Sequence, residues 1–108
     1  MRNQIAAGGA HRPARVAPKA EKKYQQGLAL MQQSRWNEAA AAFEAAIERS
    51  PQDPVFWLNL AQARRKQGDA VAAERAARRA ADLAPRSALA QRTLAASLAN
   101  QGRAAQAA

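Results

Sequence analysis

Apolar residues recur along most of this chain at the three- and four-residue spacing of an amphipathic helix. Short segments rich in Pro, Gly, Ser and Asp, which favour turns and helix ends, separate the apolar runs. We expect Gly102 to end the last complete helix and the residues after it to begin another. The pattern therefore predicts an all-α fold with helices at residues 20–33, 37–49, 54–67, 70–83 and 87–101.

The sequence also repeats itself with a fixed period. Pro51 and Pro85 are 34 residues apart, and the same shift places Ala39 on Ala73 and then on Ala107. Leu60 falls on Leu94, Gly68 on Gly102 and Ala46 on Ala80. A constant period of this length is typical of proteins that stack one helical unit on the next.

Small, aromatic and proline positions recur in one frame within the two units: Gly27, Ala39, Phe43, Ala46 and Pro51 in the first and Trp57, Leu60, Ala73, Ala80 and Pro85 in the second. Their spacing resembles the signature of the tetratricopeptide repeat (TPR) family. The resemblance covers roughly residues 20–108 and implies an α-solenoid of antiparallel helix pairs. It implies two full repeats, 20–53 and 54–87, and the first helix of a third within 88–108. A small residue at Gly27 is expected to let the partner helix pack closely.

Composition narrows the fold further. The chain has 108 residues, of which 32 are alanine and only a few are large and apolar. Such a composition suits a thin two-layer stack of closely packed helices, because Ala is the strongest helix former and buries little surface. With no cysteine the chain has no disulfide and no thiolate site. No apolar run approaches the ~18 residues that span a bilayer, so we expect a cytoplasmic protein without a transmembrane segment.

The charge is strongly basic, at +9 with 17 Lys and Arg against 8 Asp and Glu. Residues 1–19 are interrupted by Gly and Pro and carry several of these cations, so we expect a disordered basic tail there. An excess of positive charge favours acidic partners. The alternative is that abundant Ala and Arg reflect a GC-rich bacterial genome.

The sequence contains no combination of residues that would form a catalytic site. His11 is the only histidine, and it lies in the predicted tail. Asp53, Asp69 and Ser87 are placed to cap helices, and the glutamates lie on predicted helix surfaces. We therefore expect no enzyme activity, no metal and no cofactor.

The resemblance implies a binding surface instead. In TPR proteins the first helix of each pair lines a concave groove in which an extended peptide or a partner helix lies. Asn59 would hydrogen-bond the peptide backbone, and Gln25 and Thr93 occupy its equivalent positions. The implied lining residues are Tyr24, Gln25, Leu28, Met31, Val55, Leu58, Asn59, Gln62, Arg65, Lys66, Arg92 and Thr93, with Leu89 beside them.

One subclass of the family fits poorly. Chaperone-binding TPR domains hold a terminal carboxylate with a clamp of Lys, Asn, Asn, Lys and Arg. Only Asn59 matches, and the other four positions hold Tyr24, Leu28, Leu89 and Thr93. Chaperone docking is therefore disfavoured.

The function that the sequence favours is a protein–protein interaction scaffold or adaptor. Nucleic-acid binding is disfavoured, because no aromatic residue is expected beside the basic groups and Trp57 is assigned to the core. The face of helix 87–101 lacks a covering helix, so we expect a longer array or a partner there. Homo-oligomerisation through residues 88–101, with Leu94 and Leu98, is one alternative. Another is a substrate-recognition segment at the N-terminus of a larger bacterial enzyme, such as a glycosyltransferase.

Overall fold

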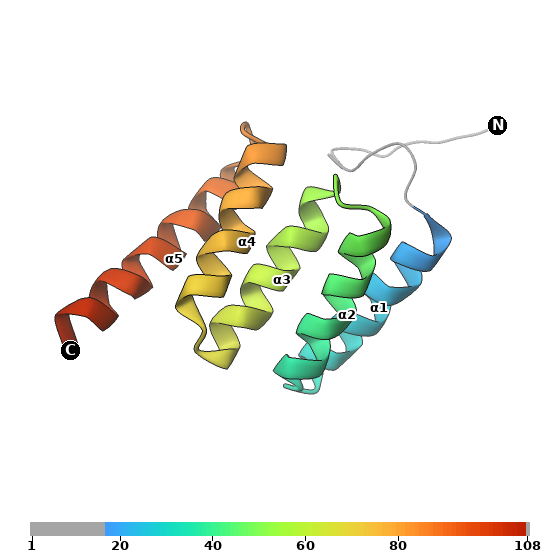
Figure 1. Ribbon diagram of the computed structural model, residues 1–108, viewed down its shortest axis with the longest axis horizontal. Helices are drawn as coiled ribbons and strands as arrows, with labels where there is room; N and C mark the ends of the chain where they lie inside the picture. The colour runs from blue at the N-terminus through green and yellow to red at the C-terminus, as the bar shows by residue number, and fades with distance from the viewer. Residues whose placement is uncertain (1–16, 108) are drawn as a thin grey trace.

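In the described part of the chain, five α-helices lie side by side in chain order, each antiparallel to the one before it (Figure 1). The computed structural model describes residues 17–107, and side chains for residues 17–102. No strand occurs within this described range. The helices are α1 (Pro18–Gln32), α2 (Trp36–Arg49), α3 (Pro54–Gln67), α4 (Ala70–Leu83) and α5 (Ala88–Ala107). The predicted all-α solenoid of helix pairs is confirmed.

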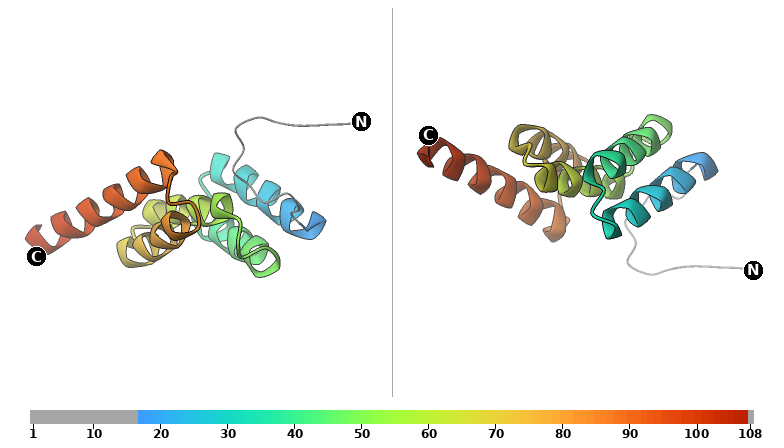
Figure 2. Two further views of the ribbon diagram at one scale, coloured as in Figure 1. Left: turned by 90° about the horizontal axis from the view of Figure 1, so that it is seen from above. Right: turned by 90° about the horizontal axis from the view of Figure 1, so that it is seen from below.

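The helices form two layers, which give the molecule a concave and a convex side. Viewed from above, α1 and α5 rise on the same side of α3, while α2 and α4 lie on the other side (Figure 2). Each helix packs mainly on its neighbours in sequence, and α5 packs on α4 with a smaller contact to α3. The first helices of successive pairs therefore share the concave side.

Short polar side chains fix where the helices begin. Asp53 is fully buried and accepts a hydrogen bond from the Val55 N–H at 2.9 Å. Asp69 accepts from the Ala72 N–H at 3.0 Å, and the Ser87 hydroxyl oxygen accepts from the Ala90 N–H at 3.1 Å. Each satisfies an amide that the first turn leaves unpaired. The capping roles predicted for all three residues are confirmed.

The first helix of each complete pair ends on a residue with left-handed backbone. Gly68 has φ 85°, and the Asp69 N–H reaches back to the Arg64 carbonyl at 3.0 Å. Thirty-four residues earlier Ser34 has φ 60°, and the Arg35 N–H bonds the Leu30 carbonyl at 3.0 Å. Glycine favours this conformation and serine does not, so the sequence did not reveal that Ser34 ends α1 as Gly68 ends α3.

Two predicted helix bounds differ from the structure by more than one residue. α1 begins at Pro18 rather than residue 20, because proline fits the first helical position, where its missing N–H is not needed. α5 runs through Gly102 to Ala107, so no separate helix begins after Gly102 within the described range. An alanine added at Gly102 would meet nothing within 4 Å, and no neighbouring element there stabilises a chain reversal. Most of the predicted tail, residues 1–16, lies outside the described residues.

The tightest contact in the core joins α1 to α2. A Cβ built on Gly27 would lie 2.4 Å from Cε1 of Phe43, so only glycine fits at this spacing. Phe43 is fully buried, and Tyr24 packs its ring against both Phe43 and Phe56, with centroids 6.1 and 5.1 Å apart. The close approach predicted at Gly27 is confirmed. Tyr24 thereby connects the core to the concave side.

The carboxylate of Glu74 on α4 forms a hydrogen bond to α5. Glu74 accepts a hydrogen bond from Nε of Arg78 at 2.7 Å and from Nε2 of Gln101 at 3.2 Å. The bond from Arg78, followed by that from Gln101, lowers the pKa of Glu74 below its usual 4.5. Because the folded pKa lies below the unfolded one, the stabilisation is complete above pH 4.5 and is lost as pH falls through the lowered value.

We expect Glu74→Gln to melt at a lower temperature than the parent protein near neutral pH, because the neutral amide accepts weaker hydrogen bonds. The difference in melting temperature should shrink as pH falls through the lowered pKa of Glu74, because the carboxylate itself then becomes neutral. Thermal denaturation followed by circular dichroism across pH measures both. A difference in melting temperature between the two proteins that stays constant down to acid pH would show that the charge of Glu74 does not stabilise the packing of α5.

Candidate functional site

A hollow of about 280 Å³ opens on the concave side where α1, α3 and α5 converge. Tyr24 enters it from the middle of α1, and Leu89 and Thr93 enter it from the first half of α5. Successive positions along one face of α3 provide the rest of the wall. The lining residues are Tyr24, Val55, Leu58, Asn59, Gln62, Leu89 and Thr93. The structure thus brings together six of the residues predicted for the groove, and Leu89 with them.

The hollow is apolar with a few neutral polar groups, and none of its lining residues carries a charge. Nδ2 of Asn59 donates one hydrogen bond to the Val55 carbonyl at 2.8 Å within α3. Oε1 of Gln62 accepts from Nη1 of Arg65 at 3.1 Å. An aliphatic side chain of a ligand would find an apolar wall here, with two amide groups beside it for hydrogen bonds.

Thr93 differs from the expectation that it would offer a polar group to a ligand. It is only 4% exposed, and its hydroxyl donates to the Leu89 carbonyl at 2.8 Å. That bond is made within α5, one turn back along the helix, as is common for threonine in helices. Thr93 therefore helps to shape the wall of the hollow rather than to recognise a polar ligand.

The other residues predicted for the groove lie outside the hollow. Leu28 and Met31 are partly buried against the core, because their face of α1 turns toward the cluster around Phe43. Gln25 is exposed, and its Nε2 donates to Glu21 at 2.8 Å on the same helix. Arg92 is exposed one turn beyond Leu89. These positions can contact only a ligand that extends past the hollow.

Two basic residues lie against tryptophan rings, which corrects the expectation that no aromatic residue is near them. Nζ of Lys66 lies 5.7 Å from the ring centre of Trp36, and the Arg79 guanidinium lies 5.9 Å from that of Trp57. Trp57 is only partly buried, and its Nε1 donates to the Pro51 carbonyl at 2.8 Å. The cations stabilise these rings by cation–π contact. Lys66 thus lies beside the α1–α2 turn and not in the hollow.

A family model described as tetratricopeptide repeat matches residues 24–88, more than half of the chain. The chain belongs to the tetratricopeptide repeat family. A peroxisomal targeting signal receptor from Pichia angusta is 36% identical to this TPR chain over 80 residues. Those residues are 73% of this chain but only 14% of the receptor's length.

Solved TPR domains share the fold. The Sgt2 TPR domain from Aspergillus fumigatus superposes with a TM-score of 0.78 at 22% identity, over 85% of this chain and 61% of that one. The first TPR domain of Spaghetti (RPAP3), bound to the HSP90 peptide SRMEEVD, gives 0.77 at 21% identity, over 88% and 73%. At these identities the likeness establishes the architecture of the TPR chain.

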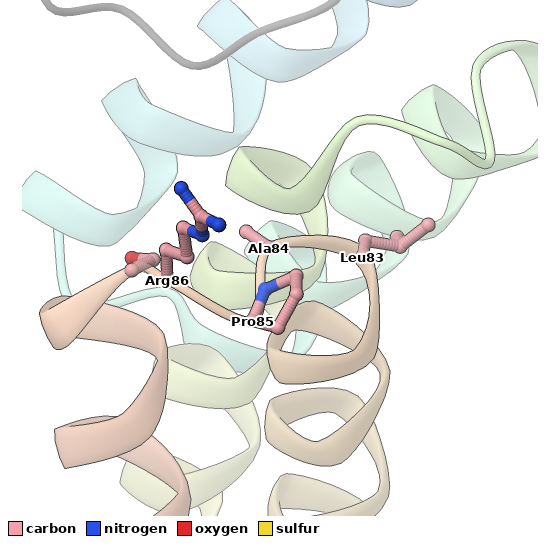
Figure 3. Close-up of a pocket in the computed structure, with 5 residues that line it drawn as sticks. Leu83, Ala84, Pro85 and Arg86 are labelled. Atoms are coloured by element: carbon pink, nitrogen blue, oxygen red, sulfur yellow. The ribbon is translucent and has the colours of Figure 1, made fainter.

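A second hollow, of about 290 Å³, lies at the turn between α4 and α5 (Figure 3). Five consecutive residues, 83–87, line it, and Leu83 and Arg86 point in different directions from the turn. A single turn provides every wall residue of this hollow, whereas residues from three helices line the concave hollow. A third hollow beside Trp36 and Lys66 is polar, and Arg35 and Glu38 in its wall already pair with each other at 2.6 Å. The concave hollow of the TPR domain is therefore the candidate site.

A metal site requires a cluster of ligand side chains, which the part of the chain that the structure describes does not provide. No three His, Cys, Asp or Glu side chains gather there at a spacing that could hold an ion. Among the same residues, no helix has the length and apolar character that crossing a membrane requires.

Proposed function

We propose that this TPR chain is a protein–protein interaction adaptor, which binds a peptide segment or a partner helix on its concave side. The observation that carries the proposal is the uncharged, largely apolar hollow to which α1, α3 and α5 all contribute. Apolar groups open to solvent in a concave surface are typical of ligand sites. The P. angusta receptor and the peptide-bound Spaghetti domain make a peptide the first ligand class to test.

Leu89 is the anchor that the proposal makes easiest to test. It is 52% exposed and forms part of the wall of the hollow. A ligand side chain that covers it would remove apolar surface from water, and Leu89→Glu would place a carboxylate there instead. The substitution lies in the first turn of α5, where an acidic residue suits the helix dipole, so the fold should persist.

Val71 provides a matched control. It is 51% exposed, it is also the second residue of its helix, and it is not part of the hollow. Val71→Glu therefore makes the same chemical change at an equivalent position on α4.

Short random peptides displayed on phage, selected on the intact chain and then synthesised, provide the ligands. We expect Leu89→Glu to weaken their binding about tenfold or more, as the loss of a buried leucine contact predicts. Val71→Glu should leave binding unchanged, and circular dichroism should show the same helicity for all three proteins. Peptides that bind Leu89→Glu as tightly as the parent, or a selection that yields no binder, would refute the proposed function.

A further inference from the structure

Two of the three helices around the hollow, α3 and α5, contain no acidic residue. Neither α3 (Pro54–Gln67) nor the described length of α5 (Ala88–Ala107) holds an Asp or Glu, whereas α2 and α4 together hold five. The cations of α3 and α5 are Arg64, Arg65, Lys66, Arg92 and Arg103. A ligand on the concave side therefore meets positive charge without competing carboxylates from these helices.

Most of the cations of α3 already have partners away from the hollow. Arg64 pairs with Glu44 of α2 at 2.5 Å. Lys66 lies over the ring of Trp36. The remaining cation of α3 is Arg65, which no described carboxylate pairs with.

Arg65 is joined directly to the hollow. Its Nη1 donates to Oε1 of Gln62, a residue of the hollow wall, at 3.1 Å. Its Nε is shielded from solvent and has no hydrogen-bond acceptor. A shielded donor without an acceptor costs free energy. Because no group of the folded chain accepts from Nε, this edge of the guanidinium is not held by a hydrogen bond. Because the residue as a whole is partly exposed, a change of side-chain torsion can offer that edge to a ligand.

We infer that the concave surface selects peptides in which a carboxylate lies next to an apolar side chain, and that Arg65 binds the carboxylate while the hollow takes the apolar group. The inference rests on the proposed function and adds the chemistry of the partner. A guanidinium presents its N–H groups as a planar fork that matches a carboxylate, and Gln62 keeps that fork beside the hollow. The carboxylate is that of an Asp or Glu side chain within the peptide, because the positions that would clamp a C-terminal carboxylate hold Tyr24, Leu28, Leu89 and Thr93 beside Asn59.

Pairs of fluorescein-labelled synthetic peptides test this directly by fluorescence anisotropy. Each peptide has a central Leu in a Gly/Ser background, with Glu or its neutral isostere Gln at each nearby position in turn and a C-terminal amide. A further pair ends on Leu as a free acid or as an amide, which tests whether a C-terminal carboxylate binds instead. We expect at least one acidic peptide to bind about five- to tenfold more tightly than its neutral counterpart.

Arg65→Gln should abolish that preference while leaving binding of the neutral peptides unchanged. Lys66→Gln is the matched control, because it removes the same charge from the adjacent residue of α3, which lies away from the hollow. It should keep the preference. Helicity and melting temperature, measured for both variants, show that they remain folded.

The outcomes separate the inference from the function on which it rests. A preference for acidic peptides that survives in Arg65→Gln would overturn the inference, as would a preference shown by the C-terminal free acid alone. Equal binding of acidic and neutral peptides that remains sensitive to Leu89→Glu would also overturn it. In each case the proposed function would stand. If none of these peptides bound the intact chain while phage-selected peptides did, the inference alone would be refuted, and a selection without any binder would refute the proposed function as well.

Discussion

Phe43→Ala is expected to lower the free energy of unfolding by about 3–5 kcal/mol, the usual cost of removing a buried aromatic ring. Phe43 is fully buried between α1 and α2, where it contacts Gly27 and the ring of Tyr24. Few other large side chains are fully buried, the next being Phe56. Neighbouring alanines cannot extend into the space that the ring leaves, so a cavity should remain.

Urea denaturation followed by circular dichroism measures this loss through the shift of the midpoint at constant slope. A domain of this size has a total stability of roughly 5–10 kcal/mol, so the variant should be close to unfolding at room temperature. Val71→Ala is the control, since Val71 is half exposed and its truncation should change stability by no more than about 0.5 kcal/mol. Equal effects of the two substitutions would contradict the assignment of Phe43 to the core.

Gly27→Val should destabilise the protein by about 3 kcal/mol, because it forces extra atoms into a contact that is already closed. A Cβ at this position would lie 2.4, 2.7 and 2.9 Å from three atoms of the Phe43 ring. Real Cβ atoms do not approach so closely, and a fully buried ring has no open space into which to move. Helix propensity alone predicts the opposite sign, since glycine is the poorest helix former after proline.

Gly102→Val separates the two effects. Gly102 is also inside a helix, but a side chain there would meet nothing within 4 Å. Its replacement should therefore be neutral or slightly stabilising, by up to about 0.5 kcal/mol.

In a double-mutant cycle, the smaller side chain of Phe43→Leu should relieve part of the cost of Gly27→Ala, with a coupling energy of about 1 kcal/mol. Independent, additive effects would show that the two residues do not compete for one space.

The sequence predicted the features that local chemistry decides. The caps at Asp53, Asp69 and Ser87 depend on a side chain and an amide two or three residues away, so their residue types and places were sufficient. The close contact at Gly27 followed from its place in the repeat. The convergence of several residues on one hollow followed from the period itself, because equivalent positions of stacked repeats share a face. The pairs Tyr24 and Leu58, Val55 and Leu89, and Asn59 and Thr93 are each 34 residues apart, and all six residues line the hollow.

The features that the sequence did not predict depend on what surrounds a residue. Ser34 and Gly102 occupy the same place in the repeat as Gly68, yet Ser34 takes the left-handed conformation and Gly102 remains helical. Ser34 and Gly68 are each followed by a helix that packs back on the one before it, whereas α5 continues through Gly102. Likewise, Arg65 and Lys66 are adjacent, but one bonds Gln62 beside the hollow and the other lies over Trp36. A helix period separates their faces, but only the packed structure shows what each face meets.

The way α5 is attached would link the proposed ligand binding to local unfolding. The hollow exists only while α5 is docked, because Leu89 and Thr93 form part of its wall, and α5 rests mainly on α4. Detachment of α5 therefore removes the site without requiring α1, α2 and α3 to unfold. A ligand that binds only the docked state stabilises that state by RT ln(1 + [L]/Kd). Occupancy of the concave side and order at the C-terminal end of the solenoid are thus two measures of one equilibrium.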